Sequence, residues 1–256
     1  MLISFEIGSR KYAADMARGI PLAIPLRFDG PQPNFFGTAR AEATPVKSGG
    51  FVGDVRQGGS CNVQSYRLVP HCNGTHTECI GHMVEERVSL PDYLPATPMP
   101  ATLVSVTPKA MVIDATMLQA ALLRHPSAGF HRGLILRTLP NGEDKLTRRY
   151  EGPLPCAYLG LDAAELLVRM DVEHLLLDVP SLDPAEDEGR MSAHRVFWGM
   201  PAESHKLADV RRPKATVTEM IYVPDSVQDG YYLLDLQIPA FMTDAAPSRP
   251  VIYPVG

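Results

Sequence analysis

The chain has 256 residues, of which 45% are hydrophobic and 21% charged, a composition that predicts a packed globular protein and excludes a disordered chain. Its 24 basic and 29 acidic residues give a net charge of −5, which argues against nucleic acid as a partner because phosphates require a basic face. The four cysteines form no Cys-x-x-Cys pair, and no apolar run resembles a leader or a membrane span, so we expect a reduced, cytoplasmic protein with no membrane partner.

The order of predicted elements favours a mixed α/β fold. The first third, with glycine pairs at 49–50 and 58–59, is expected to be rich in strands, and the proline-rich residues 91–100 to form a long surface loop. We expect strands at 111–114, 133–138, 172–179, 216–223 and 231–238, and helices at 116–125 and 162–170. Asp162, with Glu165 three residues later, is the predicted N-cap of the second helix. Helices in the middle and strands at both ends predict one mixed α/β domain over residues 1–256.

Histidines gather in one short segment. Three of the eight, His71, His76 and His82, fall between Pro70 and His82, together with Glu78. Imidazole and carboxylate groups are ligands of Zn²⁺ and Mn²⁺ in catalytic sites. In extended chain, residues two apart point to the same side, so His76 and Glu78 can converge on one ion. The alternative is that the histidines line a polar loop, but the pattern as a whole favours metal binding.

The same segment resembles the signature His-x-Gly-Thr-His-x-Asp-x-Pro-x-His of the kynurenine formamidase and cyclase family of metal-dependent hydrolases, which also includes isatin hydrolase. Four residues match in register: Gly74, Thr75, His76 and His82. Glu78 stands where the family usually has Asp, and Ile80 replaces Pro. The first histidine, His71, lies one residue too early, and Cys72 occupies its place.

That shift leaves two choices for the first metal ligand. His71 can reach the ion if Asn73 and Gly74 absorb the extra residue in a bulge, or the Cys72 thiolate can bind zinc directly. We favour His71.

The resemblance continues downstream. Residues 161–181 are similar to the family's helix and buried strand, which ends in Asp-x-Pro-Ser. The resemblance implies that His194 and Glu219 complete the metal site, and that the carboxylate at position 78 bridges two ions. These two residues are further apart than is usual in the family, so residues 202–213 must loop out. His205 is a rival of His194, but its polar neighbours predict that it faces solvent.

The resemblance implies the swivelling β/β/α type of fold and a homodimer or higher homo-oligomer. It also implies hydrolysis of an amide C–N bond in a small aryl formamide or cyclic amide, with one or two divalent ions, Zn²⁺ as first choice and Mn²⁺ as second. His82 is our choice for the catalytic residue that carries a proton to the leaving nitrogen; the alternative is that it orients Glu78. Aromatic residues early in the chain are candidates for the pocket wall: Phe35, Phe36 and Phe51.

Other functions stay open at this point. The chain could act on another small carbonyl compound or lactone, or bind metal without catalysis. A cysteine hydrolase that uses Cys72 or Cys79 with a neighbouring histidine is a third possibility. The phosphate-binding glycine motifs are absent, which argues against a nucleotide cofactor.

Overall fold

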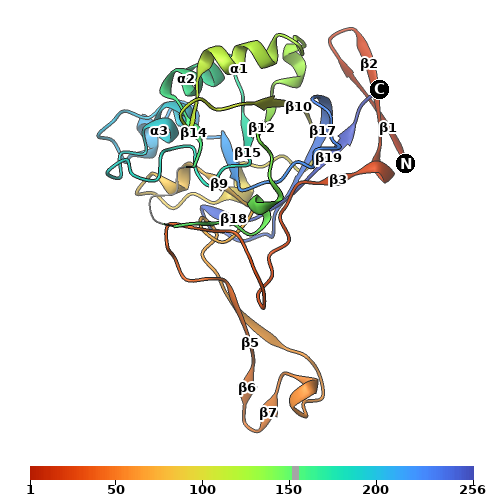
Figure 1. The fold of residues 1–256 in the computed structure, drawn as a ribbon, viewed down its shortest axis with the longest axis vertical. Helices are drawn as coiled ribbons and strands as arrows, with labels where there is room; N and C mark the ends of the chain where they lie inside the picture. The colour runs from red at the N-terminus through yellow and green to blue at the C-terminus, as the bar shows by residue number, and fades with distance from the viewer. Residues whose placement is uncertain (152–155) are drawn as a thin grey trace.

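The computed structural model describes residues 1–151 and 156–256, and within them a sheet of nine strands forms the centre of the molecule (Figure 1). The strands lie in the order β18-β9-β16-β15-β12-β10-β17-β19-β3. In chain order they are β3 (Ile20–Pro21), β9 (His76–Cys79), β10 (Met99–Val106), β12 (Gly133–Thr138), β15 (His174–Leu177), β16 (Thr216–Glu219), β17 (Gly230–Gln237), β18 (Ala245–Pro247) and β19 (Arg249–Pro254).

The middle of this sheet is parallel and buried on both faces. Strands β10, β12, β15 and β16 run parallel, while β17 on one side and β9 on the other are antiparallel to their neighbours. Alternate side chains enter different cores: Leu134 and Leu175 pack in the larger core, whereas Ile135 and Leu176 pack in a second one. Near-continuous apolar strands are typical of such doubly covered parallel sheets.

Three α-helices pack against the larger core: α1 (Ala115–Leu122), α2 (Leu161–Arg169) and α3 (Ser192–Trp198). Figure 1 shows them together on one side of the central sheet. Their buried residues include Leu118 of α1, Leu167 of α2 and Phe197 of α3. None of the helices in the described ranges is both long and apolar enough to cross a bilayer.

The remaining strands form small two-stranded sheets at the periphery. They are β1 (Leu2–Ile7) with β2 (Arg10–Asp15), β4 (Asn34–Phe35) with β13 (Arg149–Tyr150), β5 (Glu42–Pro45) with β8 (Gln64–Arg67), β6 (Lys47–Ser48) with β7 (Phe51–Val52), and β11 (Val112–Ile113) with β14 (Tyr158–Leu159). Strands β5 to β8 form an arm that projects away from the central sheet (Figure 1).

Several sequence predictions are confirmed. Helices occupy the middle of the chain and strands both ends, as a mixed α/β fold requires. The predicted strand 133–138 has the same bounds as β12, and β17 lies within one residue of the predicted 231–238. His205 is exposed, as expected, and lies in the loop after α3.

Other predictions are wrong in detail. The N-cap of α2 is Gly160, and Asp162 instead accepts hydrogen bonds from the backbone amides of Ala115 and Ala163, so it ties α2 to the start of α1. The strand predicted at 216–223 ends at Glu219, because Met220 adopts a left-handed conformation with φ of 52°.

Several elements were not predicted from the sequence, among them one central strand and one helix. The proline-rich segment predicted as a loop ends inside β10, a central strand that begins at Met99. Helix α3 has only seven residues and was not predicted.

Candidate metal and active site

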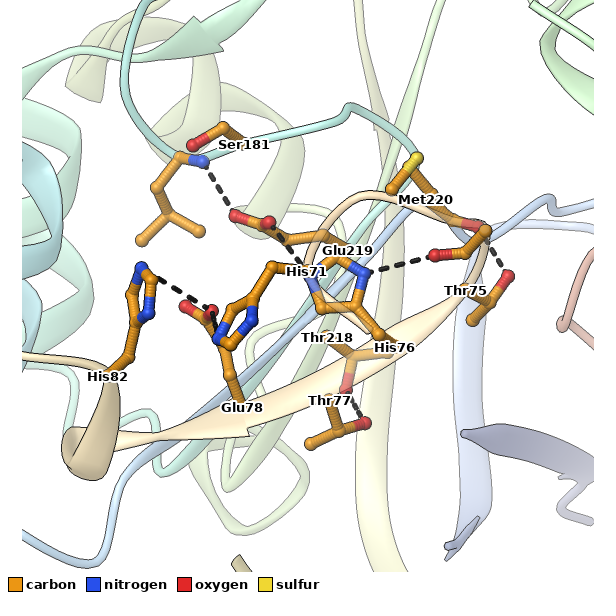
Figure 2. Close-up of polar contacts among 12 residues, drawn as sticks. His71, Thr75, His76, Thr77, Glu78, His82, Ser181, Thr218, Glu219 and Met220 are labelled. Carbon is orange, nitrogen blue, oxygen red and sulfur yellow. Dashed lines mark hydrogen bonds and ion pairs between the residues drawn. The ribbon is translucent and has the colours of Figure 1, made fainter. Parts of the chain in front are cut away.

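The site forms where β9 pairs with β16. The antiparallel register places His76 opposite Glu219 and Thr77 opposite Thr218. Directly opposed side chains share a face of a sheet, so His76 and Glu219 meet on one face and the two threonine hydroxyls meet on the other, 2.8 Å apart. Figure 2 shows His76 and Glu78 on one side of β9 and Thr77 on the other. The predicted convergence of His76 and Glu78 is therefore present.

The imidazole of His76 is fixed in one orientation and one tautomer. Its Nδ1–H donates a hydrogen bond of 3.0 Å to the carbonyl oxygen of Gly74, which can only accept. The other nitrogen, Nε2, then carries the lone pair. It is fully buried and has no hydrogen-bond partner among the residues that the structure describes, although Glu219 Oε2 lies 3.3 Å away. A buried imidazole nitrogen aimed at carboxylates, with its partner nitrogen tied to a carbonyl, is typical of a metal ligand.

Glu78 lies at the centre of the cluster and is 1% exposed. Its carboxylate is 3.0 Å from His194 Nε2, 3.5 Å from His71 Nε2 and 4.0 Å from His82 Nε2. Burial alone would raise the pKa of Glu78, but the imidazoles of His82 and His194 outweigh it and hold that pKa well below the usual value. Glu78 is therefore a carboxylate at neutral pH.

A tight turn before β9 delivers His71. Gly74 has a φ of 83°, the left-handed conformation that glycine adopts freely, so the turn accommodates the extra residue that separates His71 from His76. The Nε2 atom of His71 lies 3.1 Å from Asp244 Oδ2, and it too is buried with no hydrogen bond to any described residue.

Cys72 faces the same cavity but belongs to no cluster of potential ligand atoms in the described ranges. Burial raises the pKa of its thiol, which disfavours the thiolate. The geometry thus favours His71 over Cys72.

His194 enters the site from α3. Its Nδ1–H donates to Asp183 over 2.6 Å, and its Nε2 contacts Glu78 at 3.0 Å and Glu219 at 3.7 Å. Burial lowers the pKa of His194, but the hydrogen bonds to Asp183 and Glu78 outweigh it, so the pKa is raised well above the usual value. Trp198, one turn along α3, packs its ring 5.4 Å from the imidazole of His194.

The pKa values of Glu219 and His82 shift in the opposite directions to those of Glu78 and His194. Burial, reinforced by the charge of Glu78, raises the pKa of Glu219, whose Oε1 also accepts a hydrogen bond from the Leu182 amide. Burial lowers the pKa of His82, which stacks on His71 with ring centroids 4.3 Å apart. The lowered pKa favours a neutral imidazole at His82, in contrast to His194, whose pKa is raised.

Two clusters have the spacing of a metal site, and they share one carboxylate. One consists of His71, Glu78 and His82, the other of His76, Glu78 and Glu219, and in each the potential ligand atoms lie within 4.8 Å of one another. Ligands of a tetrahedral zinc ion at about 2.1 Å from the metal are about 3.4 Å apart. The contacts of 3.3 Å and 3.5 Å made by His76 and His71 match that spacing, so the residues present fit one or two divalent ions.

A cavity of about 420 Å³ opens beside these clusters. Its wall includes His71, Glu78, His82, His194 and Glu219, together with Phe35 and Phe36 and the loop that follows Pro180. The expectation for the two phenylalanines holds. Phe51, however, does not line this cavity: it lies on β7 in the projecting arm.

Two acidic residues at the site were not assigned roles from the sequence. Asp183 follows the Asp-x-Pro-Ser segment closely, and its position between that segment and His194 was the available signal. Asp244 precedes β18 and approaches His71 and His82 only because β18 pairs with β9, so no local pattern could have identified it.

Comparisons with known proteins identify the family of the chain. The family described as "Putative cyclase" matches residues 15–184. A kynurenine formamidase of Bacillus cereus is 29% identical over 206 residues, which cover 78% of this chain and 83% of that protein. His194 and Glu219 lie beyond the residues that the family model matches; Glu219 belongs to the second cluster, and His194 contacts Glu78.

Solved structures resemble the whole fold. A predicted metal-dependent hydrolase from Bacillus stearothermophilus superposes with a TM-score of 0.63 at 15% identity, over 92% of this chain and 98% of that one. Isatin hydrolase A from Labrenzia aggregata, bound to benzyl benzoate, gives a TM-score of 0.62 at 16% identity, over 92% and 93% of the two chains. The expected mixed α/β fold of the cyclase type is therefore confirmed.

Proposed function

The chain belongs to the cyclase family, and from that premise we propose that it is a metal-dependent hydrolase that cleaves an amide C–N bond in a small aryl formamide or cyclic amide. Hydrolysis adds water across that bond, so a formanilide would yield formate and an aryl amine, and a lactam would yield the open amino acid. The kynurenine formamidase and isatin hydrolase among the similar proteins support this class of substrate.

The observation that carries the proposal is the state of His76. Its Nδ1–H is engaged by Gly74, and its buried Nε2 faces Glu219 without a hydrogen bond. A buried nitrogen left without a partner has a free-energy cost of about 1–3 kcal/mol, which a metal ion at that point would remove.

The ligands that we propose are His71, His76, Glu78, His194 and Glu219. Glu78, which belongs to both clusters, would be shared between two ions. Nitrogen and carboxylate oxygen donors suit zinc best and manganese next. A bound divalent ion would supply Lewis acidity, which lowers the pKa of a water molecule from about 15.7 to about 7 and polarises a carbonyl group.

His82 is the residue that we propose moves the proton. It borders the cavity, its side chain is 29% exposed, and its lowered pKa leaves a neutral imidazole that can take a proton and pass it to the leaving nitrogen. Stacking on His71 and the approach of Nδ1 to Asp244, 3.8 Å away, hold the ring in place. Because His82 also belongs to the first cluster, metal content in His82→Gln separates a proton carrier from a ligand: a proton carrier leaves it unchanged.

The cysteine-hydrolase alternative has little support. Burial raises the pKa of Cys79 to about 12 and also raises that of Cys72, so neither thiol is activated as a nucleophile. A metal-binding protein without catalysis, or a hydrolase of lactones or other small carbonyl compounds, remains the second choice. The cavity directly beside the clusters favours an enzyme.

The experiment that tests the proposal combines metal analysis with a substrate screen. We expect the purified protein to contain zinc or manganese and to hydrolyse aryl formamides or lactams, N-formylkynurenine included. Chelation should abolish hydrolysis, and added metal should restore it. A metal-free protein with full activity would contradict the metal requirement, and a metal-loaded protein inactive on the whole screen would contradict the substrate class.

The assembly and location are further proposals. We propose a homodimer or higher homo-oligomer, one domain per chain and a cytoplasmic location, with a small molecule as the binding partner. Light scattering of the purified protein tests the first of these.

A further inference from the structure

The cavity beside the metal clusters has an apolar wall and an acidic one. Phe35 and Phe36 contribute aromatic surface, with ring centroids 5.2 Å apart, and Pro180, Pro184 and Met191 add aliphatic surface. Such a cavity suits a flat aromatic ring, because aromatic side chains favour edge-to-face and offset contacts with other rings.

Apart from the histidines of the metal clusters, the ionisable side chains on this wall are mainly carboxylates. Six acidic residues line the cavity, namely Glu78, Asp183, Glu186, Asp187, Glu188 and Glu219, and among the lining residues that the structure describes there is no lysine or arginine. The four positions left undescribed, 152–155, are Gly-Pro-Leu-Pro and contain no basic residue.

The three carboxylates at or next to the metal clusters already have partners. Glu78 and Glu219 are the proposed metal ligands, and Asp183 accepts a hydrogen bond from His194. Their charge is therefore offset by ions and imidazoles within the site. The remaining negative charge on the wall belongs to residues 186–188, which we call the acidic loop.

Within that loop, one carboxylate is left for a substrate. Asp187 accepts hydrogen bonds from the backbone amides of Gly189 and Met191, so it holds the shape of the loop. Glu188 forms an ion pair with Arg190. Glu186 makes no hydrogen bond or ion pair with any described residue, and it is exposed where it lines the cavity.

We propose that the site selects neutral or cationic aryl amides against those that carry a carboxylate, and that Glu186 is the residue that sets this preference. The inference rests on the proposed function, because it concerns the substrate of that same site. The acidic loop repels a substrate carboxylate, and no lysine or arginine among the described lining residues can neutralise that charge. A substrate ammonium group is attracted instead.

The test uses three formanilides that differ only at the para position: methyl, carboxylate and aminomethyl. We expect kcat/KM for the carboxylate to be lower than for the methyl compound by about tenfold or more, and the aminomethyl compound to equal or exceed it. The difference should shrink in high salt, because exposed charges are screened. Equal or faster hydrolysis of the carboxylate compound would overturn the inference.

Substitution of one residue locates the effect. Glu186→Lys should raise kcat/KM for the carboxylate compound about fivefold relative to kcat/KM of the same variant for the methyl compound, mainly through KM. Glu203→Lys is the matched control, because Glu203 is exposed, does not line the cavity and undergoes the same change in charge. An equal effect of both variants would contradict the role of Glu186.

Binding separates this inference from the proposed function. The same three compounds are titrated calorimetrically into the metal-loaded protein. If none of them is hydrolysed, the proposed function fails on these substrates, and the order of affinities still decides the charge preference: weakest binding of the carboxylate supports it, and equal or tighter binding overturns it.

Discussion

The floor and the wall of the site are built in different ways. The floor consists of His76, Glu78 and Glu219 on β9 and β16, which are almost completely buried in the sheet; of these, Glu78 and Glu219 line the cavity. The wall consists of turns and loops that are all partly exposed: the turn with His71, the segment before β18 with Asp244, and the acidic loop with Glu186.

The two parts are therefore suited to different roles. Backbone pairing fixes side chains on adjacent strands, which suits groups that must hold an ion at a set spacing. Loops on a rigid scaffold can change without disturbing the sheet, which suits groups that select a substrate. We therefore expect changes in the floor to abolish activity, and changes in the wall to adjust affinity or selectivity.

The largest effect is expected for Glu78→Gln. The neutral amide loses the charge shared by both clusters, so kcat/KM for a formanilide should fall about 1,000-fold or more, together with metal content. Thr77→Ser, on the opposite face of the same strand, keeps the hydroxyl that meets Thr218 and should retain activity. Near-normal turnover in Glu78→Gln would remove the basis for assigning the site to the floor.

The next largest effect is expected at the buried ion pair of Lys145 with Asp178, which anchors the segment between floor and wall. Here the quantity affected is the stability of the fold. Asp178, which begins the segment leading to the acidic loop, is buried and accepts hydrogen bonds from Lys145 and Thr138. Lys145→Met leaves that carboxylate without its counter-charge and should lower the free energy of unfolding by about 3–5 kcal/mol in urea denaturation.

Lys11→Met is the matched control, because the Lys11–Glu6 pair is exposed and such pairs contribute little. If both lysine variants had the same stability, the buried pair would have no anchoring role.

The sheet that carries the floor should also be sensitive to acid. Burial lowers the pKa of His174, on β15, to about 4, whereas the unfolded chain takes up that proton near pH 6.5. Between these values the unfolded state binds more protons, so stability falls as the pH falls. From pH 7 to pH 5 the contribution of His174 is a loss of about 2 kcal/mol.

His174→Asn removes this titration while keeping a polar partner for Thr216, whose hydroxyl lies 2.8 Å from His174 Nδ1. Unfolding measured at several pH values should therefore give a shallower slope for the variant. An unchanged slope would show that His174 is not the group responsible.

The smallest effect is expected in the wall. Asp244→Asn keeps the shape of the side chain but removes the charge next to His71, so metal affinity should fall about tenfold, with a modest loss of kcat. Isothermal titration with zinc measures it. A loss as large as that of Glu78→Gln would erase the distinction between wall and floor.

Site residues that lie in one short segment could be predicted from the sequence, whereas a residue brought in by long-range strand pairing could not. His71, His76 and Glu78 lie in one short segment, and the two-residue period of extended chain was enough to bring His76 and Glu78 together. Asp244 meets His71 only through the pairing of β18 with β9, a long-range register that no local pattern encodes.

The elements show a comparable limit. Strand β12 was predicted from the short apolar run 134–136, whereas β10 was missed because the prolines at 98 and 100 are typical of a loop. The expected N-cap at Asp162 was wrong because tertiary contact with α1 recruits that carboxylate instead.

The central claim is that the floor holds a metal ion through His76. Elemental analysis of wild-type protein and His76→Ala, purified in parallel and checked for folding by thermal melting, tests it most directly. We expect bound zinc or manganese in the wild type, and clearly less metal with little hydrolysis in the variant. Full metal occupancy in a folded His76→Ala would contradict it.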